Sequence, residues 1–316
     1  MNLHKDRETF SDILNLIADQ TGIRADILEK DYYVCLLLEE LSGKQNELPA
    51  FFKGGTALYK ALGTIQRFSE DIDLTVRITD CSKSQAKRRL ERSAQDYKTL
   101  DRTKNTKLEH NRKGSISCAF DYSPINISPT VDSLQRFGHV RVEATSFTVS
   151  EPTIKSRIAP VIFEMASLDQ RETLSANYAV SPFMIETIRI ERIFADKIFA
   201  AEFYYSGERR LFFDVAKHMY DIAVMSNLDI IKKMLGNPIV IDEMVGYKRK
   251  EEALRFGSDL SDKPFNAFAL PEKMKTDKEL EVVFSRMQEV YIFNDLYKIT
   301  YEDVCDSLLG VFTVLS

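Results

Sequence analysis

Two aspartates early in the chain are the residues best suited to chemistry. Asp71 and Asp73 begin the run Asp-Ile-Asp-Leu-Thr-Val, whose alternation is typical of a β-strand. Side chains at positions i and i+2 of a strand lie on one face, so we expect the two carboxylates side by side. Such carboxylates repel each other, and Mg²⁺, which binds one or two carboxylates together with substrate phosphates, would explain the pair. For an isolated Asp-x-Asp, the alternative is a solvated strand edge.

A glycine pair, Gly54-Gly55, favours a phosphate near these carboxylates. It stands between the apolar stretch 48–52 and the helical pattern 56–62, so the expected order is strand, glycine turn, helix. Glycine lets main-chain N–H groups approach a phosphate, and a helix N-terminus favours negative charge. Thr56 is expected either to cap that helix or to donate its hydroxyl to a phosphate.

Arg67 and Ser69 stand just before the aspartates, where a bound triphosphate would pass. A glycine pair alone is usually only a turn. The combined spacing, G-G-T-x-L followed by R-x-S-x-D-x-D-L, predicts a metal-dependent nucleotidyl or phosphoryl transfer site.

Glu143 is a candidate third carboxylate, in the alternating run 140–145. We expect it on the strand face that also carries Arg141 and Thr145. Two-metal transfer sites often contain three acidic side chains, of which the third activates the attacking hydroxyl. The alternative is a cross-strand ion pair with an arginine.

Two charged residues of the second half lie where a helix is expected to be apolar. Lys197 shares a helix face with Ile193 and Ala201, so it needs an anionic partner or must extend to solvent. A phosphate or the metal-site carboxylates would satisfy it, and the alternative is a structural ion pair with Asp221 or Glu143. Asp221 lies among apolar residues of a later helix and is a candidate for the same site.

Positive charge is concentrated in one part of the chain. The net charge is −5, yet residues 83–113 contain 11 Lys and Arg against 4 Asp and Glu. A basic block beside a phosphate-transfer site predicts a polyanionic second substrate. A solvated basic helix is the alternative.

The composition, with 44% hydrophobic residues in 316, suggests one large or two modest domains. No apolar run reaches the roughly 20 residues that span a membrane, and no secretory signal is recognisable. The cysteines and histidines are scattered, which predicts a cytoplasmic protein without structural zinc. Helical patterns cover 6–20, 24–42 and 84–100, and strand patterns 48–53, 71–79, 115–122 and 139–149, with mostly helical sequence from about 185.

The segment G-G-T-A-L, followed after eight residues by R-F-S-E-D-I-D-L, resembles the first motif of the AbiEii/AbiGii toxin family of nucleotidyltransferases. This family is related to the DNA polymerase β superfamily and occurs in bacterial toxin–antitoxin and phage-defence pairs. Segments 28–33, 142–143, 191–197 and 217–222 are similar to a helix before that motif and to the second, third and fourth motifs. Lys217 departs from the commoner arginine of the fourth motif.

The resemblance implies an α+β protein of two lobes. Residues 1–184 would form a nucleotidyltransferase-fold mixed sheet with helices, and residues 185–316 a mainly helical lobe.

The resemblance also implies roles for individual residues. Ser69 would contact the nucleotide phosphates, and Asp71 and Asp73 would hold Mg²⁺. Lys197 would position the triphosphate, and Asp221 would complete the site. Gly54, Gly55, Thr56, Arg67, Glu143 and Lys217 are the candidate substrate-binding residues.

The implied activity is transfer of nucleotides from an NTP to RNA, at the 3′ acceptor end of tRNA, which would block translation. An antitoxin encoded nearby is expected, without a prediction of direct contact. One alternative is nucleotidyl or phosphoryl transfer to a protein or small molecule. The other is an inactive binding module of the same fold.

Overall fold

The chain forms two structural units in the computed structural model, which describes residues 1–63, 66–125, 137–148, 150–256 and 263–316. The first unit comprises Met1–Ala61, Ser69–Ser146 and Thr153–Thr187, and the second Leu62–Phe68, Phe147–Pro152 and Ile188–Ser316. The expected α+β class is confirmed. The expected single boundary at 184/185 stays a prediction. In the structure, the second unit also includes two short segments from earlier in the chain.

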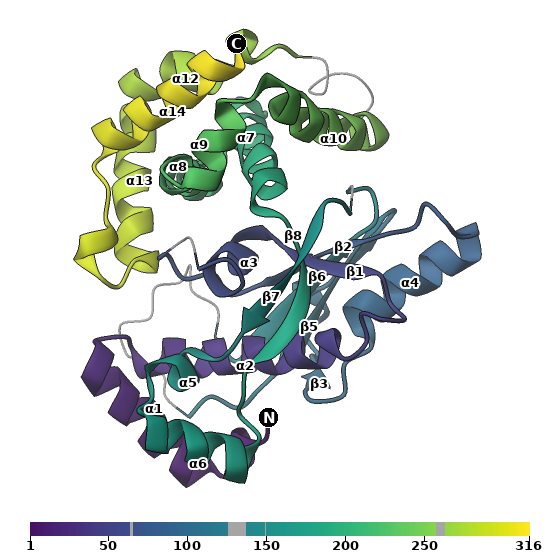
Figure 1. Ribbon diagram of the computed structural model, residues 1–316, viewed down its shortest axis with the longest axis vertical. Helices are drawn as coiled ribbons and strands as arrows, with labels where there is room; N and C mark the ends of the chain where they lie inside the picture. Colours follow the sequence, from purple (N-terminus) through teal and green to yellow (C-terminus); the bar gives the residue numbers. More distant parts are fainter. Residues whose placement is uncertain (64–65, 126–136, 149, 257–262) are drawn as a thin grey trace. The chain divides into compact units, whose positions relative to one another are not determined.

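A mixed eight-stranded sheet forms the core of the first unit (Figure 1). The strands follow the order β3-β5-β6-β2-β1-β8-β7, and β4 pairs with β5 outside that path. Their bounds are β1 (Ala50–Lys53), β2 (Ile72–Val76), β3 (Asp101–Arg102), β4 (His110–Arg112), β5 (Ser115–Asp121), β6 (His139–Thr145), β7 (Thr153–Ile158) and β8 (Phe183–Ile188). The expected strands therefore exist, with somewhat shorter bounds.

Strand β2, which carries the candidate site residue Asp73, lies inside this sheet between β6 and β1. It pairs antiparallel with β1 and parallel with β6, and β6 pairs antiparallel with β5. Alternation gives β2 and β6 a buried apolar face, which includes Ile72 and Leu74 of β2 and Val140 and Val142 of β6. The residues between them point to the opposite face, which carries the charged side chains.

Helices cover the sheet of the first unit. Helix α4 packs against β2, β5 and β6 and begins at a capping box formed by Ser82 and Gln85. The helices are α1 (Arg7–Thr21), α2 (Ala25–Ser42), α3 (Gly54–Lys60), α4 (Lys83–Gln95), α5 (Val161–Met165) and α6 (Leu168–Tyr178), with short 3₁₀ turns η1 (Leu3–Lys5) and η2 (Thr106–Leu108). The helices expected over 6–20 and 24–42 are thus confirmed, and the one expected over 84–100 is present but ends earlier, at Gln95.

Buried charges on α2 tie this helix to neighbouring elements. Asp31 forms an ion pair with Lys60 of α3 at 2.7 Å and accepts a hydrogen bond from the N–H of Val161, in the first turn of α5, at 2.7 Å. Burial disfavours the ammonium of Lys60, but the attraction of Asp31 outweighs it and raises the pKa of this lysine. Lys30 donates to the main-chain oxygen of His139 in β6. Helix α2 therefore holds α3, α5 and β6 by charged contacts.

The second unit is helical. Helix α8 packs against α7, α9, α13 and α14, and its apolar face includes Met219 and Ile222, which are fully buried. The elements are α7 (Ile190–Ser206), α8 (Phe212–Ser226), α9 (Asp229–Leu235), α10 (Pro238–Phe256), η3 (Phe265–Ala267), α12 (Ala269–Lys273), η4 (Met274–Thr276), α13 (Lys278–Tyr291), η5 (Asp295–Tyr297) and α14 (Tyr301–Leu315). Within the described ranges, no helix combines the length and the apolar character that crossing a bilayer requires.

Candidate active site

The expected carboxylates share one face of the sheet in the first unit. Asp73 lies in β2 and Asp71 directly precedes that strand, and both are half-buried. In the pairing register, Asp73 stands beside Glu143 of β6 on one side and Lys53 of β1 on the other. Neighbouring strands are about 4.8 Å apart and residues in register point to the same side. The predicted common face of the two aspartates is therefore confirmed, and Glu143 joins it.

Gly54 lies against one of these carboxylates. Its φ is +79°, a left-handed conformation, and a Cβ built on it would be 2.2 Å from Oδ2 of Asp73. Only a residue without a Cβ allows this approach. The expectation of a glycine turn before the helix is wrong, because Gly54 and Gly55 form the first turn of the helix itself. This helix, α3, has only seven residues.

Thr56 is fully buried. Its hydroxyl donates to the main-chain oxygen of Asp71 and lies 2.9 Å from Oγ of Ser69. The residue at the N-cap of α3 is Lys53, whose side chain makes no cap hydrogen bond. Thr56 therefore neither caps the helix nor has a proton left for a phosphate; it fixes α3 to the segment before β2. Ser69 is half-buried at the same junction.

Arg141 of β6 contacts Asp71 directly. Its Nη2 donates to Oδ2 of Asp71 at 2.6 Å, with side chains 31% and 16% exposed. The parallel register explains the contact, because Ile72 pairs with Val142 and the residues before them are neighbours. Nε of Arg141 is buried and has no hydrogen-bond partner among the described residues.

Within the part of the chain that the structure describes, Glu143 lacks the ion pair with an arginine that was the alternative to a functional role. Its side chain accepts a long hydrogen bond, 3.5 Å, from Oγ of Ser115 in β5, which lies 2.9 Å from Nε2 of His110. No ion pair involves Glu143 within the described residues. Its carboxylate stands on the same face as the two aspartates.

In the second unit, Asp221 of α8 is the centre of a buried charge cluster. It accepts two hydrogen bonds from Arg67, from Nε at 2.6 Å and from Nη2 at 2.7 Å. Nζ of Lys197 lies 3.0 Å from Oδ2 of Asp221, so the expected structural alternative for Lys197 is observed. Asp221 is 0%, Arg67 4% and Lys197 6% exposed. Burial opposes ionisation of Asp221, but the attraction of Arg67 and then of Lys197 holds the pKa of this carboxyl well below its usual range.

Two neighbouring residues of α8 differ in their contacts. Lys217 pairs with Asp214 at 2.8 Å on the more exposed side of the helix. His218 stacks on Tyr204, and its buried Nδ1 has no partner within the described part of the chain. Burial, followed by repulsion from Lys197, lowers the pKa of His218 well below its usual value, so this imidazole is neutral at pH 7.

The aspartate pair fits a hard divalent cation. Among the described residues, no group of three or more His, Cys, Asp and Glu side chains is arranged to hold a metal ion. Mg²⁺ needs no such group, since it is commonly bound by one or two carboxylates together with substrate oxygens. The space that a Cβ at Gly54 would fill is taken by the Asp73 carboxylate, so the glycine lets this oxygen donor lie against the start of α3.

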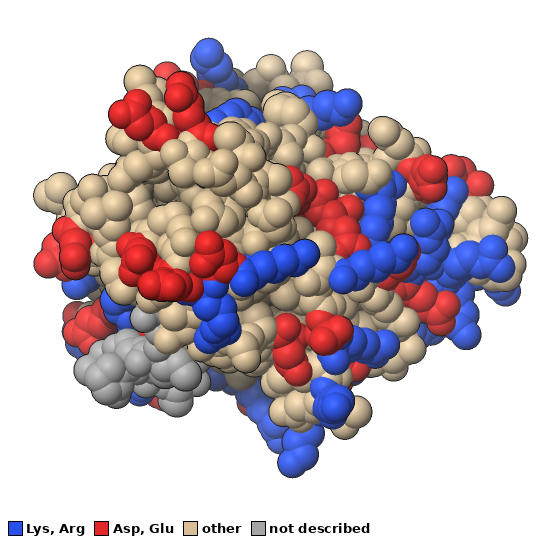
Figure 2. All heavy atoms as spheres, turned by 90° about the horizontal axis from the view of Figure 1, so that it is seen from below, with Lys and Arg blue, Asp and Glu red and all other residues tan. Residues whose placement is uncertain are grey.

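The basic block, residues 83–113, lies on the surface of the first unit. Figure 2 shows Lys and Arg gathered on the right side of the visible face, the side on which α4 lies in Figure 1. The exposed cations of the block are Lys83, Lys87, Arg88, Arg92, Lys98, Arg102, Lys104, Lys107, Arg112 and Lys113. Arg89 differs, because it donates to Asp80 at 2.8 Å and to the main-chain oxygen of Arg77 at 3.0 Å.

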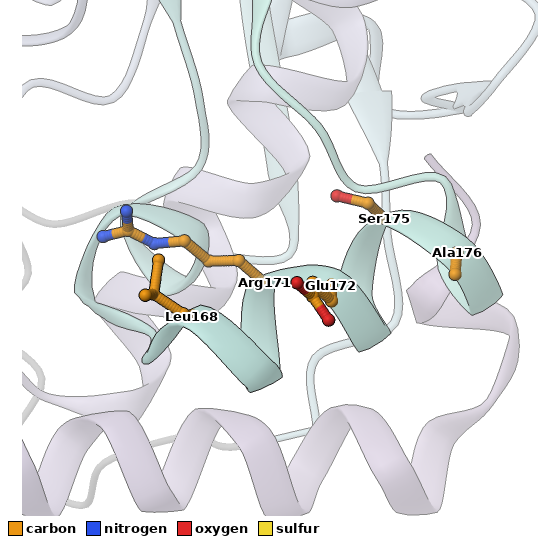
Figure 3. A pocket seen from close by; sticks show the side chains of 5 residues that line it. All are labelled: Leu168, Arg171, Glu172, Ser175 and Ala176. Atoms are coloured by element: carbon orange, nitrogen blue, oxygen red, sulfur yellow. The ribbon is translucent and has the colours of Figure 1, made fainter.

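A shallow pocket on α6 lies away from these residues. Figure 3 shows its lining side chains, which come from this one helix: Leu168, Arg171, Glu172, Ser175 and Ala176. Its arginine already donates to the main-chain oxygens of Phe163 and Glu164 at the end of α5. The pocket therefore offers little chemistry.

Lys53 and Arg141 were not candidates from sequence. Arg141 could have been recognised, because alternation along its strand predicts that it shares a face with Glu143. Its contact with Asp71 depends on the register of two strands that are 70 positions apart, and sequence alone does not specify that register.

Comparison with known proteins identifies the chain's relatives. A solved nucleotidyltransferase toxin, MenT4 (Rv2826c) from Mycobacterium tuberculosis H37Rv, matches with a TM-score of 0.38 and 12% identity, over 94% of this chain and 98% of the toxin. No curated protein matches the chain. The family model described as "Nucleotidyl transferase AbiEii toxin, Type IV TA system" matches residues 36–291. The chain therefore belongs to the AbiEii family of nucleotidyltransferase toxins of type IV toxin–antitoxin systems.

Proposed function

We propose that this nucleotidyltransferase uses Mg²⁺ to transfer nucleotides from an NTP to RNA, at the 3′ acceptor end of tRNA, and so blocks translation. The observation that carries the catalytic part is the shared sheet face of Asp71, Asp73 and Glu143. The RNA part is supported by the ten exposed cations of the basic block, since Lys and Arg neutralise backbone phosphates.

The chemistry follows from the sheet face of the first unit. Asp71 and Asp73 would hold Mg²⁺, which when bound neutralises charge on the triphosphate and on the departing pyrophosphate. The absence of a Cβ at Gly54 lets the Asp73 carboxylate lie against the start of α3, and Ser69 would donate its hydroxyl to a phosphate. Glu143 would accept the proton of the attacking RNA hydroxyl. A bond then forms between that oxygen and the α-phosphorus, and the bond to pyrophosphate breaks.

Lys197 would bind the triphosphate while it keeps its ion pair with Asp221. An ammonium has three N–H donors, so one can stay on the carboxylate at 3.0 Å while another contacts a phosphate oxygen. Asp221 and Arg67 are then positioning residues, because their polar atoms are directed to each other inside the unit. Lys217, which is partly exposed, would contribute a further positive charge toward the substrate.

The proposed setting is the bacterial cytoplasm, where tRNA and NTPs are available, with phage defence as one biological role. A type IV toxin has an antitoxin partner. We do not include direct contact with that antitoxin in the proposal.

The test is label transfer. The purified chain is incubated with each α-labelled NTP, Mg²⁺ and either total tRNA or a tRNA-free cell extract. We expect label on tRNA, loss of label with Asp71→Ala or with EDTA, and extra nucleotides when tRNA 3′ ends from expressing cells are sequenced. Label on a protein or a small molecule instead would favour that acceptor. Transfer to tRNA that is unchanged in Asp71→Ala would refute the assigned site.

A second prediction concerns the basic block. Replacing Lys87, Arg88 and Arg92 together with Gln should weaken tRNA binding by about tenfold to a hundredfold and reduce the slope of log K against log salt by about 1 to 2. These side chains have only long i,i+4 ion pairs or none within the described residues, so the fold should be retained. Filter binding between 50 and 300 mM salt measures both quantities.

The matched control removes positive charge elsewhere on the first unit. Lys155 and Arg157 of β7 are 68% and 52% exposed and pair with surface glutamates. Their replacement with Gln should leave the tRNA salt slope unchanged. Equal losses in both variants would mean that the basic block is not a specific RNA surface.

A further inference from the structure

Arg141, in the strand that carries Glu143, makes a direct bond to a proposed metal ligand. Its Nη2 donates to Oδ2 of Asp71 at 2.6 Å, and the pair is partly exposed. An arginine bound to a carboxylate competes with any metal ion for that oxygen. The apparent metal affinity is then the intrinsic affinity multiplied by the fraction of molecules in which this ion pair is broken.

The same guanidinium has unused capacity for hydrogen bonds. Nε is buried and has no partner among the described residues, although a guanidinium presents five N–H donors in a planar fork. A buried donor that lacks an acceptor is unfavourable unless a ligand supplies one. Phosphate oxygens match the fork geometry, and Arg141 lies in the strand that carries Glu143.

We propose that Arg141 exchanges partners during substrate binding: it neutralises Asp71 in the free protein, and it binds a phosphate of the nucleotide once the metal takes that carboxylate. This inference rests on the proposed assignment of Asp71 as a metal ligand. The exchange explains how three carboxylates, Asp71, Asp73 and Glu143, share one sheet face before substrate arrives. It also makes metal binding and nucleotide binding mutually dependent.

The test measures binding in the absence of turnover. Mn²⁺ affinity of the nucleotide-free protein is measured by electron paramagnetic resonance, and affinity for each α,β-methylene NTP is measured by calorimetry with Mn²⁺ present. Arg141→Gln should bind Mn²⁺ about fivefold more tightly, since its competitor is removed, and should bind nucleotide at least about tenfold more weakly. Arg141→Lys keeps the charge but loses the fork, so its Mn²⁺ affinity should stay near that of the unmodified chain while nucleotide binding weakens.

Two controls separate the possible failures. Arg157→Gln removes an arginine that is paired with Glu164 at 2.8 Å on another strand of the same sheet, and it should change neither affinity. Asp71→Asn should abolish or strongly weaken Mn²⁺ binding. If Asp71→Asn matters but Arg141→Gln binds Mn²⁺ no more tightly, the partner exchange is wrong and the proposed function survives. If Asp71→Asn has no effect on Mn²⁺, the metal-site assignment fails, and this inference fails with it.

Discussion

Gly54→Ala should reduce nucleotide transfer by at least about a hundredfold while the chain stays folded. The added methyl group would be 2.2 Å from Oδ2 of Asp73, so that carboxylate must move. A misplacement of about 1 Å at a reacting centre can lower the rate by about 100-fold. Alanine at φ +79° costs a further 1–2 kcal/mol or so in folding stability. Label transfer and urea unfolding measure the two effects separately.

Gly22→Ala is the matched control for this variant. Gly22 ends α1 with φ +73°, nearly the conformation of Gly54, but a Cβ there would meet nothing within 4 Å. The Gly22→Ala variant should lose a similar amount of folding stability to backbone strain, and it should keep full nucleotide transfer. If Gly54→Ala were as active as Gly22→Ala, the close approach of α3 to Asp73 would have no catalytic importance.

Asp221→Asn should destabilise the protein by about 3–5 kcal/mol, because it removes the buried carboxylate charge with which both Arg67 and Lys197 pair. This is a large part of a typical stability of about 5–15 kcal/mol. Urea unfolding at pH 7, followed by helical circular dichroism, measures the loss. Lys197→Met should cost less, since Arg67 still neutralises Asp221 through two hydrogen bonds.

The effect of Asp221 should also depend on pH. The folded protein holds the pKa of this carboxyl below its ordinary 3.8, so its stabilisation is complete above that value and is lost as the pH falls through the folded pKa. The difference between the unmodified chain and Asp221→Asn should therefore be constant from pH 7 to 5 and shrink below about 3.8. Asp214→Asn is the control on the same helix: its pair with Lys217 is partly exposed and is worth about 1 kcal/mol or less. A loss as small as that of the control would contradict a structural role for Asp221.

Local periodicity was enough to predict the carboxylate face. Alternation along β2 and β6 specifies which side chains share a side of the sheet, so Asp71, Asp73 and Glu143 were recognisable from sequence. The helical spacing around Lys197 likewise predicted a buried lysine that needs an anion. Both inferences depend only on residues within a few positions of each other.

The partners of these residues could not be predicted in the same way. Arg67 and Asp221 are 154 positions apart, and their contact is fixed by tertiary packing alone. The sequence suggested that Arg67 would contact a triphosphate, whereas its donors are directed to a carboxylate. Thr56 is of a residue type that often caps helices, but its hydroxyl donates to the main-chain oxygen of Asp71 instead. It cannot cap α3, because this helix begins two residues earlier than its sequence pattern indicates.

The composition of the second unit has a consequence for dissecting this protein. Leu62–Phe68 belongs to that unit although it precedes most of the first unit in the chain, and it carries Arg67. A fragment cut at the expected boundary, 185–316, would contain Asp221 without the guanidinium that binds both of its oxygens. Neither half is then an independent module, and recombination that exchanges one lobe between related toxins must transfer this short segment as well.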